Sequence, residues 1–425
     1  MVRYHVRFLN MKEFCLLTEE EYTAFQKTSA LRGFLNSKEA VHLKKANGWL
    51  TEYAGVKEDG KVIAATPLTM IPLMKIYRFC HAQSGFLMDY HDEETLSFFV
   101  QELKKHLAKQ KVVYMLVNPN IDHVERDIDG NEVEGGYDNS YVKEALERNG
   151  FEHQGFVRDY SAFTMISWIF TLDLTDKTEA QVLKEMDQQT RWSVNKTVKQ
   201  GIQVRELKPE EIGKFIEMEE RTAKRRGFEM REHDFYKKQL DAYGEHAKVL
   251  LAYLDLNEFR ENLKKEKEQL DADMAEVNEK LAEMPNSKKF VKKQRVIQEA
   301  LDLNEKKWKE ADETEAEHGS LLEMAASFFI IYDNEIVYLY SAAEDEYRKY
   351  NAPYAIQLAI IRYAIEHHIP RYNFYGISGN FSKDADDYGV YEFKKGFGGR
   401  VEQLIGEFVL PVNKAVYKLY KTVKK

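Results

Sequence analysis

The sequence predicts an α/β protein of two successive units, with a long helical hairpin inserted in the second unit. Strand and helix patterns alternate through residues 1–160, and the alternation restarts after residue 160. Residues 257–317 are mostly Lys, Glu, Asp, Gln, Asn or Ala, with a sparse apolar repeat. Strand-like segments at 249–253 and 326–332 flank this stretch, as expected of one folded unit that is interrupted. We therefore expect four ranges: a first unit at 1–160, the second unit's two parts at 161–255 and 318–425, and a helical arm at 256–317.

The arm is predicted from its seven-residue apolar spacing, which is typical of two helices sealed along a narrow seam. Pro285 lies in a turn-forming segment and ends the first helix, because proline cannot continue a helix. The seam residues of the two helices are Leu256, Leu263, Leu270 and Val277, then Phe290, Ile297, Leu301 and Trp308.

The two units have a similar rhythm of elements, which suggests a duplicated fold. In the first unit we expect strands at 49–53, 62–66 and 112–117, and an amphipathic helix at 93–110. In the second we expect a strand at 168–174, one helix at 178–200 and a strand at 202–207. A helix follows at 209–226, and after the arm come a helix at 353–368 and a strand at 371–375.

Composition predicts a cytoplasmic protein with substantial cores. The chain has 425 residues, of which 44% are hydrophobic. Its start lacks an apolar signal core, and the longest apolar stretch, 161–172, is shorter than the roughly 20 residues of a spanning helix. Cys15 and Cys80 are the only cysteines, as in proteins of a reducing compartment.

Charge argues against a protein that binds nucleic acid over its whole surface, because the formal net charge is −9. Local basic clusters remain compatible either with solvated helix faces or with contacts to a polyanion. They comprise Arg191, Lys196, Lys199 and Arg205; Lys224, Arg225, Arg226 and Arg231; and Lys288, Lys289, Lys292, Lys293 and Arg295.

Several enzyme signatures are missing from the sequence. It contains no Gly-x-x-x-x-Gly-Lys-Ser/Thr loop for nucleotide phosphates and no His-Glu-x-x-His metal motif. We expect neither a cofactor nor a catalytic metal. What remains is a strand that ends at Gly376, followed by Lys394 and Lys395 among aromatic residues and glycines. A lysine in such surroundings can face an anion or a developing oxyanion, although a surface lysine pair beside a turn has the same spacing.

These residues together resemble the FemABX family of non-ribosomal peptidyltransferases, and the resemblance runs nearly end to end. The combination of motifs is specific, whereas any one of them is not. The matching segments are Phe34-Leu-Asn-Ser37, Gly85-Phe-Leu-Met-Asp-Tyr90, Gly155-Phe156, Asn195-Lys196 with Lys199-x-Gly201, Tyr372-Asn-Phe-Tyr-Gly-Ile-Ser-Gly379, Phe393-Lys-Lys-Gly-Phe397 and the helical arm.

The resemblance implies two tandem domains of the GCN5-related acetyltransferase fold, with an antiparallel coiled-coil arm in the second. It implies an enzyme that moves glycine, alanine or serine from aminoacyl-tRNA to the stem-peptide amine of lipid II, or of a UDP-linked muropeptide precursor. Contact with the membrane would then be peripheral, at its inner face. The arm could contact tRNA, or it could pair the protein with a second copy or a sister transferase.

The resemblance also implies roles for particular residues. Lys394 would stabilise the oxyanion and hold the tRNA end, with Phe393 stacking on a terminal base. Lys44 and Arg231 would hold the diphosphate of the precursor, although the family tryptophan between Ser37 and Lys44 is alanine here. The other candidates for substrate binding are Tyr236, Tyr338, Tyr340, Lys395 and Gly376.

One departure bears on the mechanism. The family often has Asp-Pro where this chain has Asn118-Pro119, and that aspartate is a candidate general base. Asparagine cannot accept a proton near neutral pH, so either the amine arrives neutral, which we favour, or activity is reduced. Two alternatives stay open. One is an acyl-CoA-dependent N-acyltransferase, which shares the fold, although this sequence lacks the pyrophosphate loop that such enzymes usually have. The other is a non-catalytic tRNA-binding paralogue, which only Asn118 supports.

Overall fold

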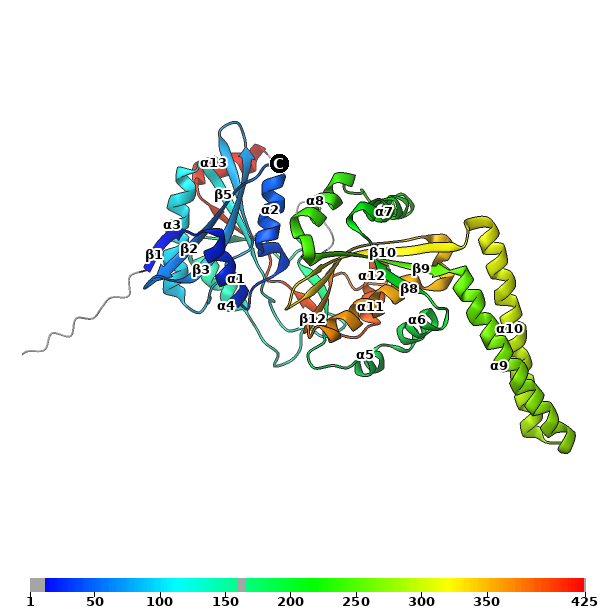
Figure 1. Cartoon of the computed structure of the whole chain (residues 1–425). Coiled ribbons are helices and arrows are strands. Elements are labelled where there is room, and N and C mark those ends of the chain that lie inside the picture. Colours follow the sequence, from blue (N-terminus) through cyan, green and yellow to red (C-terminus); the bar gives the residue numbers. More distant parts are fainter. Residues whose placement is uncertain (1–11, 159–164, 424–425) are drawn as a thin grey trace, which may run out of the picture.

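The computed structural model describes residues 12–158 and 165–423 and contains two seven-stranded mixed sheets, one in each unit (Figure 1). The first sheet has the strand order β1-β2-β3-β4-β5-β14-β6, and the second has the order β13-β7-β12-β11-β10-β9-β8. Each sheet has its own buried apolar core. This confirms the predicted α/β class and the division into two successive units.

The first unit packs its helices on a sheet of long antiparallel strands and one parallel pair. Helix α3 buries Leu96, Phe99, Val100, Leu103 and Leu107 against the sheet, as its apolar spacing predicts. The elements are β1 (Lys12–Leu16), α1 (Glu19–Thr28), α2 (Lys38–Ala46), β2 (Leu50–Glu58), β3 (Lys61–Leu73), β4 (Tyr77–Ser84), α3 (Glu93–Lys109), β5 (Val112–Pro119), α4 (Ser140–Arg148) and β6 (Glu152–His153).

The elements predicted for the second unit occur in the expected order, with one of them divided. The helix predicted at 178–200 is two helices, because Met186 is extended and the carboxylate of Asp187 caps a new helix by accepting the Thr190 N–H at 2.6 Å. The elements are β7 (Trp168–Asp173), α5 (Glu179–Glu185), α6 (Gln188–Lys199), β8 (Gln203–Glu206), α7 (Ile212–Arg226), α8 (His233–Tyr243), β9 (Ala247–Asp255), β10 (Leu321–Ile331), β11 (Ile336–Ala343), α11 (Ala352–Glu366), β12 (Arg371–Ile377), α12 (Tyr388–Lys395) and β13 (Arg400–Gln403).

The carboxyl end of the chain returns to the first unit. Strand β14 (Phe408–Pro411) pairs with β5 and β6, and helix α13 (Lys414–Val423) packs on the same sheet. The expected range 318–425 had placed this end in the second unit. Short apolar strands carry no local mark of the sheet they join. Of the longest apolar stretch, 161–172, residues 161–164 lie outside the described residues.

The helical arm is confirmed as α9 (Leu256–Glu283) and α10 (Lys288–His318). It is inserted between β9 and β10, which pair with each other, so the sheet closes beneath it. Leu263, Val277 and Ile297 are buried in its seam, and the buried amide of Asn304 donates to the Leu263 carbonyl at 3.0 Å. Figure 1 shows the arm projecting away from both units. Among the described helices, none is long and apolar enough to cross a membrane.

The two sheets differ at their parallel strand pairs. In the first sheet, β4 and β5 stay paired from Arg78–Val112 to Ser84–Pro119. In the second, β11 and β12 pair only at Ile336–Tyr372 and Val337–Asn373 and then separate. Beyond that point β12 keeps its other neighbour, β7. The second sheet is therefore split along part of its length, and the first is not.

Candidate functional site

A narrow cavity lies between the two units, on the first-unit side of the split. Ser84, Asn118 and Asn120 line it from the first unit, and Glu335 and Tyr375 line it from the second. Its free volume is about 30 Å³, which is room for about one water molecule. An elongated substrate would therefore need the two units to move apart here.

Lys394 lies at the split in the second sheet. It is the seventh residue of α12, and its side chain is only 5% exposed. Its Nζ donates to the carbonyl of Gly376 at 2.5 Å and to that of Tyr375 at 3.4 Å. Burial lowers the pKa of Lys394 to about 7, while the carboxylate of Asp387 acts in the opposite direction. Tyr375 also lines the cavity, so the ammonium group of Lys394 contacts the backbone of a residue that lines the cavity.

The other residues predicted beside Lys394 have structural partners. The half-buried ring of Phe393 packs edge-on against Tyr354, with 5.0 Å between ring centroids. Lys395 is paired with Asp129 of the first unit at 2.5 Å, so it helps to join the two units. A Cβ on Gly376 would meet Ile166 at 2.8 Å. This glycine therefore admits a neighbouring side chain, and the close approach of a substrate is not needed to explain it.

Lys44 and Arg231 come from different units, and their charges interact across the interface. Lys44, at the end of α2, holds its Nζ over the ring of Trp49, 4.6 Å from the centroid. Burial lowers the pKa of Lys44, and the nearby charge of Arg231 lowers it further. Arg231 is exposed just before α8 and lies over the ring of Phe235. Two neighbouring cations that repel each other are suited to an anion with more than one charge.

The three predicted groove tyrosines do not lie together. Tyr236 and Tyr340 are in contact, with ring centroids 5.5 Å apart, on the face of the second sheet that packs against α7 and α8. Tyr338 lies in the core on the opposite face, stacked on Phe329. A β-bulge between the pairs Phe328–Tyr340 and Phe329–Tyr338 adds Leu339 and reverses the side-chain alternation. In a strand without this bulge, Tyr338 and Tyr340 would lie on one face of the sheet.

Asn118 lines the cavity at the end of β5 and is 8% exposed. Its Oδ1 accepts the backbone N–H of Ser84 at 3.2 Å, which fixes the orientation of the amide. His81 Nε2 lies 3.0 Å from the same oxygen. Burial lowers the pKa of His81 to about 4, so the ring is neutral and donates through Nε2. The Nδ2 of Asn118 has no hydrogen-bond partner among the described residues.

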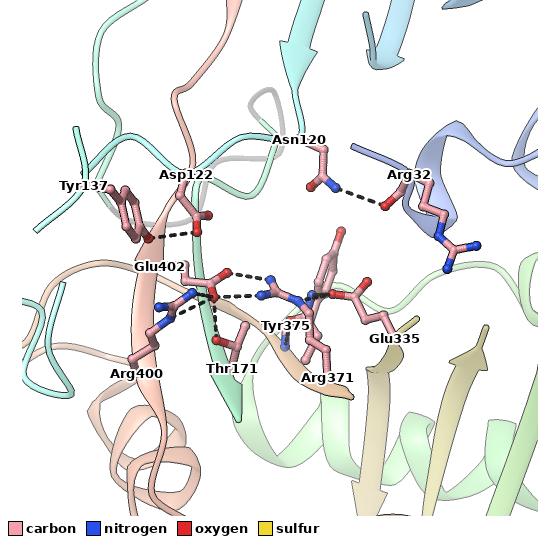
Figure 2. A network of polar contacts seen from close by, with 11 residues as sticks. Arg32, Asn120, Asp122, Tyr137, Thr171, Glu335, Arg371, Tyr375, Arg400 and Glu402 are labelled. Carbon is pink, nitrogen blue, oxygen red and sulfur yellow. Dashed lines mark hydrogen bonds and ion pairs between the residues drawn. The ribbon is translucent and has the colours of Figure 1, made fainter. Parts of the chain in front are cut away.

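A buried ionic network lies at the interface between the units, and sequence analysis missed it. Arg371 pairs with Glu335 at 2.7 Å and with the fully buried Glu402 at 2.5 Å. Figure 2 shows Asp122 of the first unit facing these second-unit groups, while Asp122 also accepts the hydroxyl of Tyr137 at 3.0 Å. Burial, together with the charge of Glu402, raises the pKa of Asp122 to about 7. The available signal was charge inside strand patterns, at Arg371 and Glu402.

Comparisons with known proteins agree along the whole chain. The profile described as the FemAB family matches residues 17–425. "Aminoacyltransferase FemA" of Staphylococcus epidermidis strain RP62A is 35% identical over 414 residues, 97% of this chain and 99% of the relative. The protein of the same name from Staphylococcus aureus strain MRSA252 is 34% identical over 97% of this chain and 98% of its own. The structure titled "Crystal structure of FemX" superposes with a TM-score of 0.83 at 24% identity, covering 96% of this chain and 99% of the other.

Proposed function

The chain belongs to the FemAB family and is an aminoacyltransferase of peptidoglycan cross-bridge synthesis, and on that premise we propose its two substrates. The donor is an aminoacyl-tRNA that carries glycine, alanine or serine. The acceptor is the stem-peptide amine of a lipid-linked peptidoglycan precursor. The reaction takes place at the inner face of the membrane.

The position of Lys394 is the observation that best supports this proposal. Its ammonium group is buried against the Gly376 carbonyl where β11 and β12 separate, next to a residue of the cavity between the units. A backbone gap beside a buried cation suits an ester whose carbonyl oxygen gains negative charge. The first sheet has no such gap along β4 and β5.

In the proposed reaction the acceptor amine attacks the ester carbonyl carbon of the donor. A C–N bond forms, the C–O bond to the ribose breaks, and the proton lost by the amine ends on the ribose oxygen or on water. Lys394 stabilises the oxyanion between these events, which requires it to leave its two backbone carbonyls. The ester is already activated, so positioning and one fixed cation suffice.

Phe393 makes a base platform at the donor end in this proposal. Its ring already packs against Tyr354 and Phe397, so a base would stack on the part of the ring face that these residues leave exposed. Gly376 and Lys395 take indirect parts, because the glycine makes room for Ile166 and the lysine joins the units through Asp129.

The acceptor lies along the interface between the units, with its diphosphate at Lys44 and Arg231. Those two cations come from different units, so a bound diphosphate would also draw the units together. Tyr340 is half-buried near the charge of Arg231 and can contact the acceptor near its phosphates. The fully buried Tyr236 supports the ring of Tyr340, and Tyr338 supports the core of the second sheet. The amine reaches Asn118 in its neutral form.

The arm is the second candidate surface for tRNA. Its exposed cations gather near the tip, at the start of α10: Lys288, Lys289, Lys292, Lys293 and Arg295. Replacing residues 257–317 by a short linker distinguishes tRNA contact from pairing with a second copy or a sister transferase. Lower tRNA affinity supports contact, whereas unchanged affinity with lost self-association rules it out.

The direct test is to incubate the protein with lipid II and a mixture of charged tRNAs, and to identify the product by mass. A mass increase of one or more glycine, alanine or serine residues on the stem peptide supports the proposal and identifies the donor. Acyl-CoA thioesters offered in a parallel reaction serve as the control. Acylation from the thioester and not from tRNA would contradict the proposal.

A further inference from the structure

We propose that one end of the first sheet, here called the hairpin end, docks on an anionic lipid surface. Four segments meet there: the start of β2, the turn between β3 and β4, the start of β5, and the passage from β14 into α13. Figure 1 shows α13 and the end of α2 at this end, at the top of the view. The arm projects from the far side of the second unit.

The turn between β3 and β4 is an exposed apolar tip. Strand β2 starts at Leu50, opposite Met70, while β3 continues to Leu73 before it turns. Three further residues at about 3.3 Å each carry the tip about 10 Å past the end of β2. Ile76 is 64% exposed and Met74 is also exposed, with Lys75 between them. Ile76 is the most exposed of the large apolar side chains in the described part of the chain.

Helix α13 lies beside the base of this tip. Tyr417 and Tyr420 of the helix share one apolar cluster with Leu73 and Tyr77, the residues that flank the turn. The aromatic face of the helix is therefore already packed against the sheet. Leu419, on the outer face of the helix, is nonetheless 61% exposed. Two neighbouring elements thus leave aliphatic side chains in water that the fold does not use, which marks an interaction surface.

The charge of the hairpin end differs from that of the whole protein. The chain has 71 acidic and 62 basic residues, yet the segments 45–50, 70–78, 108–113 and 410–422 contain no acidic residue. The exposed lysines of these segments that form no ion pair among the described residues are Lys45, Lys75, Lys109, Lys111, Lys414 and Lys418. Aliphatic side chains surrounded by unpaired lysines are complementary to an anionic bilayer surface. A single-stranded nucleic acid would instead favour exposed aromatic rings on which its bases can stack.

The location of Lys44 connects this surface with the proposed diphosphate site, and this step rests on the proposed function. Lys44 holds its Nζ over Trp49, and Trp49 directly precedes Leu50 at the hairpin end. The diphosphate of a lipid-linked acceptor lies at the bilayer surface, because its hydrocarbon chain is inserted in the membrane. Docking the hairpin end would place the Lys44 and Arg231 pair at the depth of that diphosphate.

The test measures co-flotation of the full chain with vesicles. Phosphatidylcholine vesicles with about one-third phosphatidylglycerol should bind the protein, and binding should weaken as salt is raised. Ile76→Glu and Leu419→Glu should each lower the partition coefficient about tenfold. Each of Lys75→Gln, Lys414→Gln and Lys418→Gln should lower it about fivefold at low salt.

Matched controls sit elsewhere on the molecule. Leu303→Glu alters an apolar side chain of similar exposure, 52%, on the arm. Lys61→Gln removes an exposed lysine at the opposite end of β3 that forms no ion pair within residues 12–158 and 165–423. Both controls should bind vesicles like the wild type. Equal losses in controls and test variants would overturn the inference, as would wild-type binding no stronger than to pure phosphatidylcholine.

The same variants also test whether tRNA or a second copy of the chain, instead of a lipid surface, occupies the hairpin end. Loss of tRNA affinity, or loss of self-association, in Ile76→Glu with no wild-type vesicle binding would overturn the lipid assignment. Transfer to a water-soluble muropeptide precursor is measured alongside. Transfer without vesicle binding refutes the docking surface and leaves the proposed function intact. Vesicle binding without transfer to any acceptor refutes the proposed function alone.

Discussion

The two units of this chain share an architecture and differ at one place, the parallel strand pair of each sheet. In the first unit, β4 and β5 remain hydrogen-bonded from end to end, and their last residues present Ser84 and Asn118 to the cavity. In the second unit, β11 and β12 separate after two residue pairs. Backbone groups freed in the interior of a sheet need partners, and the ammonium of Lys394 provides one for Gly376.

The difference indicates a division of labour between similar folds. A closed strand pair can only offer side chains at its end, as a wall for a bound molecule. A split pair offers a gap, exposed carbonyls and a buried charge, which together can hold a reacting group. We therefore expect substitutions at the split to change the rate of transfer, and those at the closed pair to change acceptor binding.

The strongest way to break this comparison is Lys394→Met, which keeps the length of the side chain and removes its charge. Transfer should fall about 10²–10³-fold, because one oxyanion contact is lost in a water-poor site. Single-turnover rates with saturating donor and acceptor measure this effect. Lys395→Met is the matched control and should change the rate little, since that side chain pairs with Asp129. Equal effects of the two substitutions would remove the special role of the split.

Arg231→Ala should weaken acceptor binding rather than slow the chemical step. The loss of one charge-assisted contact to a phosphate corresponds to roughly a 10–100-fold higher KM for the acceptor, with kcat little changed. Initial rates at varied lipid II concentration give both constants. Lys224→Ala, in a neighbouring basic cluster, is the control and should leave KM unchanged. A fall in kcat at constant KM would mean that Arg231 acts on the transition state.

The pH profile distinguishes the charge of Lys394 from its shape. Because the pKa of Lys394 is lowered to about 7, the charged form is lost as pH rises through 7 in the free enzyme. The value of kcat/KM should then fall about tenfold per pH unit above this point. Lys394→Arg keeps its charge throughout, so whatever activity it retains should lack this decline. A decline that persists in Lys394→Arg would belong to a different group.

Asn118→Asp tests the closed pair, and its effect should be less than tenfold. The N–H of Ser84 and the His81 ring already use one oxygen at this position, so an aspartate adds only its second oxygen toward the cavity. If the amine arrives neutral, a base there adds little. A gain of several hundredfold in transfer would show that the natural asparagine impairs the enzyme. Asn118→Ala, which removes the amide, measures how much of any change comes from binding alone.

Local patterns predicted most elements, while long-range pairing escaped them. The heptad spacing located the arm, because seam residues recur within one helix. Nothing local in Phe408–Pro411 shows that it crosses to the first sheet, since the choice of partner depends on contacts nearly 300 residues away. The bulge at Leu339 is equally hidden, because the extra residue is defined by the register of β10.

The candidate site divides in the same way. Motif resemblance identified Lys394, Lys44 and Arg231 as candidates, and the charges of Lys44 and Arg231 interact across the interface between the units. The sequence could not identify the network of Arg371, Glu335 and Glu402. Buried charges are expected in pairs, but the sequence does not reveal which strands bring the partners together. Asn118 was identified as a departure, but only its hydrogen bonds show which atom faces the cavity.

The smallest expected effect concerns Asp122, which lies at the interface between the two units. Folding raises the pKa of Asp122 from 3.8 to about 7, so between these values the folded protein holds a proton that the unfolded chain has lost. Stability therefore falls as pH rises through this window. Asp122→Asn imitates the protonated form and can still accept from Tyr137. Its melting temperature should exceed that of the wild type by roughly 1–3 °C at pH 8 and match it near pH 4. A lower melting temperature at pH 8 would mean that Asp122 is charged there, and that attraction to Arg371 and Arg400 stabilises the interface between the units.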